Sequence, residues 1–482
     1  MTTKTFYERF SEWTRHSIML RIFSIAILVL LLLIPASMIE DLIRERSSYR
    51  DAAIREVSSK WGEAQTITGP VLTLPYTTYF KDNEGRVTTA TEYAHFLPES
   101  LNVQAQLSPE TRYRGIYDVV VYTTHLQCSG EFGYPDIALL NLDPANVQWD
   151  DAYVSIGISD LRGIEEAVTL RWQQQDYPFD PGVGSTDLFT TGISTLVRLD
   201  SARRTLAYGF DATLKGSQSL QFMPLGRTTE VTIRSDWPNP SFDGAFLPDE
   251  RTVNENGFTA RWQVLHLNRN FPQAWKGSQY RFASPGAALP VADDYYFDRP
   301  MEVEAAAIAE ASGYGFGVNL LRPVDEYQKA MRSAKYAIVF IALTFLVFFF
   351  VETLNRKRIH PVQYLLVGLA LCIFYALLVA ISEQLSFNLA FLLSSVAVTA
   401  LITLYCYSIF RQQRLTLLVG LLLVLLYGFV FTLLQLQDYA LLIGSIGLFA
   451  VLALVMYFSR KIDWYALAEG EQEVPQNTAS GV

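Results

Sequence analysis

The sequence predicts a membrane protein with two parts: an α-helical bundle of six spans, and a large all-β, sandwich-like domain inserted between spans 1 and 2. Three observations carry this prediction. Six apolar runs approach or exceed the roughly 18 to 20 residues that a membrane-spanning helix needs. The long segment between the first two runs alternates apolar and polar residues, which is typical of β-strands. Charged residues make up only 18% of the 482-residue chain, below the roughly 25% usual for soluble proteins.

The apolar runs give the predicted boundaries of the six spans. These lie at 22–39, 334–351, 362–381, 387–410, 415–436 and 439–458. Linkers of only about two to ten residues separate the last five runs. A water-soluble core is therefore excluded, because runs packed so densely leave nothing polar to cover them.

The first run is predicted to be an uncleaved signal anchor rather than a signal peptide. Its apolar stretch is longer than a typical signal-peptide core, and Pro35-Ala36-Ser37-Met38 is a poor cleavage site. Apolar residues then recur at helical spacing up to Gly62, which predicts a helical stalk at 40–61. A second stalk at 324–333 is predicted to continue into span 2, giving one helix over 324–351.

Basic residues predict the orientation, because Lys and Arg are enriched on the cytoplasmic side. They cluster in both tails and in the linkers after spans 2 and 4: Lys4, Arg9, Arg15, Arg21; Arg356, Lys357, Arg358; Arg411, Arg414; Arg460, Lys461. The linkers around Glu383 and Asp438 carry no Lys or Arg. Six spans place every cluster on one side, so the tails at 1–21 and 459–482 are predicted to be cytoplasmic and 40–333 to lie outside.

Charge and cysteine content separate the two parts further. The outer segment has 26 Lys and Arg against 39 Asp and Glu, a net charge of −13, and the rest of the chain carries +3. The overall charge of −10 argues against a nucleic-acid partner, which needs a basic face. Cys128 is the outer segment's one cysteine, so no disulfide forms within it. Cys372 and Cys406 lie in apolar runs and are interpreted as small hydrophobic residues.

The outer segment is predicted to form antiparallel sheets packed as a sandwich. Apolar residues alternate along short runs bounded by turn residues: Val154, Ile156, Ile158; Leu170, Trp172; Leu206, Tyr208, Phe210. Whether the domain is one sandwich or two lobes stays open at this level. The similar tetrapeptides at 96–99 and 246–249 indicate an internal duplication.

No motif predicts a catalytic, cofactor or metal site. The histidines are dispersed, at His16, His95, His125, His266 and His360, and the chain has no GxSxG or HExxH motif. The densest acids are interpreted as solvated turns, with a weak calcium site as the alternative: Asp150, Asp151, Asp293, Asp294 and Asp298.

The glycines at 313–317 indicate a strand with close backbone approach rather than a phosphate loop. The aromatic cluster at 237–246 indicates a packed sheet edge, with a ligand ledge as the alternative.

The spans are predicted to form a structural bundle rather than a pump. No Asp, Glu, Lys, Arg or His lies in the middle third of any span, where coupled transporters place such residues. Polar residues within the spans suit hydrogen bonds between helices: Ser394, Ser395, Thr399, Thr403 and Thr432. Gly444 and Gly447 suit close helix packing.

The sequence resembles the CreD family of inner membrane proteins, called cell envelope integrity proteins. The segments that carry the resemblance span nearly the whole chain: 114–118, 237–248, 257–262, Pro323-Val324-Asp325 with Tyr327, 332–336, His360–Ala370, Glu383 and 387–396. The resemblance implies a Gram-negative inner membrane protein under two-component control, tied to envelope stress and to tolerance of antibiotics or colicins. It implies no catalytic residue, ligand or partner.

The first functional hypothesis is therefore a non-enzymatic protein that maintains the cell envelope. Its expected partners are the lipid bilayer and an unidentified envelope protein or ligand on a periplasmic β domain. The alternatives are a transporter or lipid-handling permease that uses the last five spans, and a periplasmic hydrolase whose residues are scattered in sequence.

Overall fold

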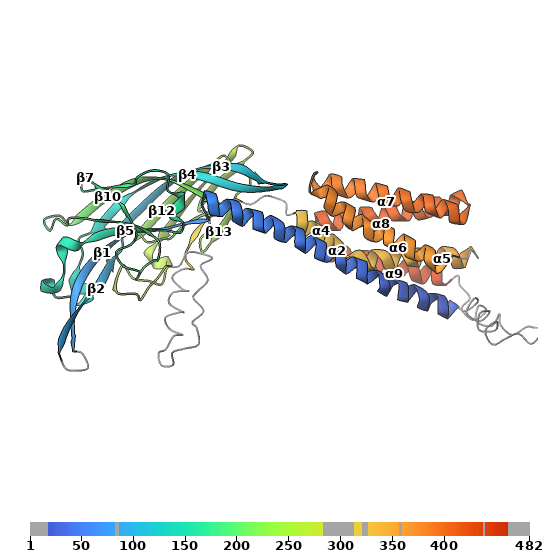
Figure 1. Cartoon of the computed structure of the whole chain (residues 1–482), viewed down its shortest axis with the longest axis horizontal. Helices are drawn as coiled ribbons and strands as arrows, with labels where there is room; N and C mark the ends of the chain where they lie inside the picture. The colour runs from blue at the N-terminus through green and yellow to red at the C-terminus, as the bar shows by residue number, and fades with distance from the viewer. Residues whose placement is uncertain are drawn as a thin grey trace, which may run out of the picture. The chain divides into compact units, whose positions relative to one another are not determined.

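The computed structural model describes residues 18–81, 86–282, 313–320, 326–355, 359–436 and 439–460. The chain divides into a helical unit, residues 1–50 and 324–482, and a β unit, residues 51–323. The predicted fold class is confirmed: an apolar N-terminal helix, a large β domain and a C-terminal cluster of apolar helices follow one another (Figure 1).

The helices match the predicted spans with one difference. Their bounds are α2 (Ile18–Trp61), α4 (Glu326–Lys335), α5 (Ala337–Leu354), α6 (Pro361–Ser382), α7 (Phe387–Phe410), α8 (Gln413–Gln435) and α9 (Ala440–Ser459). Among the described residues, α2 and α6 to α9 are long and apolar enough to cross a membrane, and α4 with α5 makes a sixth span if counted as one. The first helix continues without a break to Trp61, as its amphipathic extension predicts (Figure 1).

The prediction of one helix over 324–351 is wrong. The axes of α4 and α5 meet at 43° around Tyr336. The Tyr336 N–H donates to the Ser333 carbonyl at 3.1 Å, which is the tighter i→i−3 bond found at helix ends. Arg332 and Lys335 occupy the last turn of α4, where cations favour the helix C-terminus. No proline or glycine marks this break in the sequence.

The helical unit packs around one apolar core formed by α2, α4, α5, α6, α7 and α8. A Cβ on Gly368 would lie 2.1 Å from Leu32 of α2, so glycine at this position lets α2 and α6 approach closely. Gly447 likewise faces the Phe429 ring, where a Cβ would come within 2.2 Å. The predicted role of Gly447 in close packing is confirmed.

The predicted hydrogen bonds between helices are wrong for two of the residues. Ser395 donates to Leu392 O at 2.9 Å and Thr432 donates to Gly428 O at 2.9 Å, both within their own helices. Hydroxyls in helices reach the carbonyl three or four residues back, which satisfies them without a neighbouring helix.

The β unit contains two sheets. The nine-stranded sheet runs β13 (Ser241–Gly244), β17 (Phe316–Asn319), β11 (Ser219–Phe222), β1 (Gln65–Lys81), β5 (Tyr153–Ile158), β9 (Gly192–Leu196), β8 (Asp180–Pro181), with β2 (Val87–Phe96) on β1 and β16 (Ala274–Lys276) on β2. The eight-stranded sheet runs β14 (Glu250–Asn254), β15 (Gly257–Leu265), β12 (Thr228–Ser235), β3 (Ser100–Arg114), β4 (Tyr117–Gly133), β10 (Thr205–Ser217), β6 (Thr169–Trp172), β7 (Gln175–Pro178).

The two sheets share one main core, to which both contribute buried residues. The sandwich prediction is confirmed, but its purely antiparallel form is wrong, because β1 pairs with β11 and β3 with β12 in parallel. A second apolar cluster, which includes Phe189 and Trp275, packs separately from the main core. This extra layer explains why β5, predicted to alternate, is buried along its whole length.

The two tetrapeptides occupy equivalent places. Each directly precedes the first strand of a hairpin, β3–β4 or β14–β15. The Glu99 N–H donates to Glu131 O at 2.8 Å, and the Asp249 N–H donates to Arg261 O at 2.9 Å. Ser100 and Glu250, the next residues, pair with those same acceptors. The two hairpins therefore begin in the same way, and the internal duplication stays a prediction.

Candidate functional site

A polar cluster in the helical unit joins α2, α4 and the end of α6. Glu383 caps the C-terminus of α6, and its side chain is 12% exposed. Tyr327 of α4 donates its hydroxyl hydrogen bond to Glu383 Oε1 at 3.1 Å, and Arg46 Nε of α2 lies 3.8 Å from the same oxygen. The Arg50 guanidinium lies 5.4 Å from the centre of the Tyr327 ring. These four residues are called the Glu383 cluster.

Other contacts show that the helices alternate in direction. Gln435 Nε2, at the end of α8, donates to Asn388 Oδ1, at the start of α7, at 2.8 Å. At the opposite end of α6, the Tyr364 hydroxyl donates to Glu352 Oε2 of α5 at 3.0 Å. Arg50 and Tyr327, the described residues of the helical unit that flank the inserted domain in sequence, therefore both lie at the Glu383 end of the bundle.

The C-terminal end of α2 is fixed within the β unit by what we call the Trp61 socket. The Trp61 indole N–H donates to Tyr122 O at 3.2 Å. The Arg112 guanidinium and the Lys215 ammonium each lie 4.6 Å from the Trp61 ring centre, so both make cation–π contacts. Gly62, at a φ of 152°, ends the helix where a Cβ would lie 2.7 Å from Lys215 O. Only glycine allows this close approach.

Arg162 completes the Trp61 socket. Its Nη1 donates to Ser59 O at 2.6 Å, in the last turn of α2, and its Nη2 donates to Glu63 Oε1 at 3.0 Å. Its Nε donates to Asp160 Oδ1 at 2.9 Å. Burial opposes ionisation of Asp160, but these arginine bonds and two backbone N–H donors outweigh it and hold the pKa of Asp160 below its ordinary value.

A second polar group lies inside the β unit, around His95. Thr73 Oγ1 of β1 lies 3.0 Å from His95 Nδ1 on the neighbouring strand β2, directly across the ladder. His95 Nε2 lies 3.5 Å from Asp187 Oδ2, and the Trp275 ring centre is 5.8 Å away. Thr73 and His95 are both 0% exposed. Thr, His and Asp are residue types that occur together in nucleophilic sites, but here the Thr73 and His95 side chains are not exposed to solvent.

Comparison with known proteins identifies the family. A family model described as "Inner membrane protein CreD" matches residues 17–465. A protein of that name from Escherichia coli (strain K12) is 33% identical over 443 residues, which cover 91% of this chain and 92% of the relative. The chain belongs to the CreD family. It is a multi-pass inner membrane protein with a large β domain inserted after its first span.

Half of the Glu383 cluster lies within segments that carry the resemblance to the CreD family. Tyr327 and Glu383 belong to those segments, while Arg46 and Arg50 do not. Sequence reasoning did not bring the four together, because their contacts join residues 46 to 383 across three helices. The Trp61 socket could not be predicted from the sequence. Trp61 meets Arg112 and Lys215, and Arg162 meets Ser59, only in the folded domain.

The remaining candidate residues take the following places in this CreD family member. Asp150 and Asp151 lie in a short 3₁₀ turn with no buried residue. Phe316-Gly317 begins β17, where a Cβ on Gly317 would lie 2.1 Å from Leu220 O, which confirms the close strand approach. Phe242 lies on the edge strand β13 and packs against Trp262, which confirms the sheet edge. His16, Asp293, Asp294 and Asp298 lie outside the described residues.

Metal ligands do not gather in the described part of the chain. No three His, Cys, Asp or Glu side chains there are placed to hold a metal ion. Cys128, Cys372 and Cys406 are buried and unpaired with one another. Burial raises the pKa of the Cys128 thiol well above its ordinary value, which keeps it protonated.

Acid should destabilise the β unit through His95. Burial holds the pKa of His95 below its ordinary value of 6.5, against the opposing effect of Asp187, and the nearby histidine lowers the pKa of Asp187. Both groups therefore bind protons more readily in the unfolded chain, so stability is lost as pH falls below 6.5 and further through the ordinary aspartate range. Thermal unfolding of the full chain, followed by β-sheet circular dichroism between about pH 7.5 and about pH 5, measures the slope.

The matched comparison is between two histidines. His95→Gln should flatten the slope near pH 6, whereas His125→Gln, at an exposed position on β4, should keep it. Equal slopes in both variants would contradict the role given to His95.

Proposed function

We propose that this CreD family member maintains cell envelope integrity under stress as a non-enzymatic inner membrane anchor. One observation carries the proposal: α2 is a single helix that side chains fix at two places beyond its apolar stretch. Arg46 and Arg50, in the interior of α2, belong to the Glu383 cluster, and Trp61, its last residue, lies in the Trp61 socket. A helix held in this way transmits tilt or rotation instead of absorbing it. The β domain thereby becomes mechanically coupled to the bundle.

The proposed orientation places the β domain in the periplasm and both termini in the cytoplasm. Arg411 follows the end of α7, Arg414 lies in the first turn of α8, and Arg460 follows the end of α9. All three lie at the bundle end away from Glu383. The preference of arginine for the cytoplasmic side supports this assignment. The net charge of −13 at 40–333 then faces the periplasm. The bilayer and an envelope protein or ligand are the proposed partners, and no nucleic acid is expected.

Charge reversal tests the Glu383 cluster. Arg46→Glu places a second carboxylate beside Glu383, and Glu383→Arg places a second guanidinium beside Arg46. Each single variant should lower envelope tolerance to that of a strain lacking the protein, and the double variant should restore most of it. Reversal is needed because simple neutralisation of a partly exposed pair costs only about 0.2–1 kcal/mol. The assay is survival of a complemented deletion strain under β-lactam or colicin stress.

Arg44→Glu is the control, since Arg44 is exposed on the same helix and pairs with Glu40 and Asp41. It should retain full tolerance. Full tolerance in both Arg46→Glu and Glu383→Arg would contradict the coupling role of the cluster.

Two assays separate the alternative functions. Reconstituted full-length protein that drives steady flux of a labelled lipid or β-lactam across vesicles would favour the permease over the anchor. Hydrolysis of an envelope substrate that depends on Thr73 or His95 would favour the hydrolase, although both residues are fully buried.

A further inference from the structure

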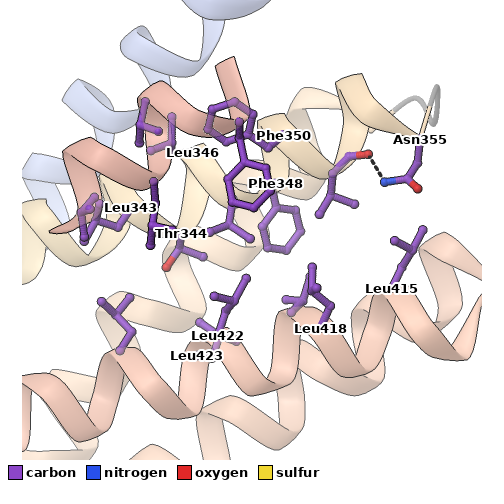
Figure 2. A pocket seen from close by; sticks show the side chains of 18 residues that line it. Leu343, Thr344, Leu346, Phe348, Phe350, Asn355, Leu415, Leu418, Leu422 and Leu423 are labelled. Atoms are coloured by element: carbon purple, nitrogen blue, oxygen red, sulfur yellow. Dashed lines mark hydrogen bonds between the residues drawn. The ribbon is translucent and has the colours of Figure 1, made fainter. Parts of the chain in front are cut away.

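An apolar cavity opens between three helices of the bundle. Its volume is about 440 Å³, within the range of roughly 300–1,000 Å³ typical of ligand sites. It is lined by α5, α8 and α9, whose side chains converge on it (Figure 2). The lining is apolar except for Thr344 and Asn355. Thr344 Oγ1 donates to Phe340 O at 2.9 Å, and one Asn355 amide N–H donates to Val351 O at 3.0 Å. The rest of the cavity wall offers hydrocarbon contacts.

The cavity is elongated along the helices and ends at one rim of the bundle. Asn355 and Leu415 lie together at one end in Figure 2, and Leu343 lies toward the other. Phe458 also lines the cavity, and its ring centre is 6.1 Å from that of Phe350 on α5. The cavity therefore reaches the membrane end where α5 stops, α8 starts and α9 stops.

Two arginines stand at this rim. Arg414 directly precedes Leu415, and Arg460 follows Phe458 by two residues. Both side chains are exposed. Among the residues that the structure describes, no carboxylate pairs with either arginine. The two arginines thus place unpaired positive charge beside the apolar cavity.

We propose that this cavity binds one anionic phospholipid, with an acyl chain between α5, α8 and α9 and the phosphate at Arg414 and Arg460. An apolar slot inside the bilayer is filled by hydrocarbon, and cationic pockets between spanning helices select anionic headgroups. The weak packing of α9 fits this occupant, because the described bundle buries none of the residues in its apolar stretch, Leu441–Ser459. The lipid bridges α9 to α5 and α8, where protein contacts are few.

Lipid retention by the purified full-length chain tests the proposal. The chain is equilibrated with phosphatidylglycerol and phosphatidylcholine of identical acyl chains, and native mass spectrometry counts the lipids that remain bound. One phosphatidylglycerol per chain should be retained, with a preference of roughly 10- to 30-fold over phosphatidylcholine from two rim arginines. Arg414→Gln with Arg460→Gln should reduce that preference to about threefold or less. Leu422→Trp, which fills the slot, should lose most of the bound lipid of either kind.

Matched controls lie outside the cavity. Arg44→Gln removes an exposed arginine beside the opposite membrane end, and Leu404→Trp enlarges an exposed residue of α7 that does not line the cavity. Both should retain lipid like the unchanged chain. A photoactivatable phosphatidylglycerol should crosslink to α5, α8 and α9 in the unchanged chain, which removes any dependence on variant folding. Equal retention of the two lipids, a preference that survives loss of both arginines, or crosslinks confined to other helices would each overturn the proposal.

Discussion

Replacement of Ala53 by proline is expected to abolish envelope tolerance while the protein still inserts into the membrane. Ala53 lies in α2 between Arg50, at the Glu383 cluster, and Trp61, in its socket. Proline there removes one helical hydrogen bond and clashes with the preceding turn, at a cost of about 3 kcal/mol or more in a helix interior. The cost should appear as a kink, because the core of the β unit and the core of the bundle each form separately.

Ala53→Ser is the matched control. Serine costs only about half a kcal/mol or less in helix propensity, so tolerance should be close to normal. Immunoblots of membrane fractions measure insertion, and survival under β-lactam stress measures tolerance. Full tolerance of the proline variant at normal membrane levels would make α2 a passive linker.

Trp262→Ala is expected to produce the largest loss of stability in the β unit. Trp262 of β15 is fully buried, and its ring lies 5.8 Å from Phe242 of β13 and 5.7 Å from Phe316 of β17. It therefore joins the eight-stranded sheet to the nine-stranded sheet. Removal of a buried tryptophan side chain costs about 3–5 kcal/mol through lost burial and the cavity left behind. Chemical denaturation of the full chain, monitored by tryptophan fluorescence and circular dichroism, measures the loss.

Two further variants calibrate this result. Trp262→Phe keeps most of the ring but loses the indole N–H bond to Phe246 O, and should cost less than the alanine change. Leu267→Ala, at a residue 80% exposed, should be nearly neutral. A Trp262→Ala cost below about 1 kcal/mol would show that the aromatic contact does not hold the two sheets together.

The sequence predicts features that depend on local patterning. Apolar runs locate the spans, because the bilayer imposes a minimum length on each. Strict alternation of Leu206, Tyr208 and Phe210 correctly predicts the buried face of β10. The amphipathic stretch after span 1 correctly predicts that α2 continues to Trp61.

Features that depend on contacts between distant residues could not be predicted in this way. Parallel pairing of β1 with β11 joins segments about 150 residues apart, and no local period encodes it. The main core buries one face of β5 and the second apolar cluster packs on the other, which erases the alternation expected of a half-exposed strand. No proline or glycine in the sequence marks the bend at Tyr336. In the Glu383 cluster, Tyr327 and Glu383 belong to segments that resemble the CreD family. Their contacts with Arg46 and Arg50 could not be predicted from the sequence.

Thiol labelling of single cysteines tests the central claim, that the β domain faces the periplasm and is anchored by a bundle with a cytoplasmic arginine rim. Cysteine is placed at Asn256, in the exposed turn between β14 and β15, or at Gln412, exposed before α8, in a chain lacking Cys128, Cys372 and Cys406. A membrane-impermeant reagent should label position 256 in intact spheroplasts and position 412 only after permeabilisation. Labelling of position 412 in intact spheroplasts, with position 256 protected until permeabilisation, would contradict the account.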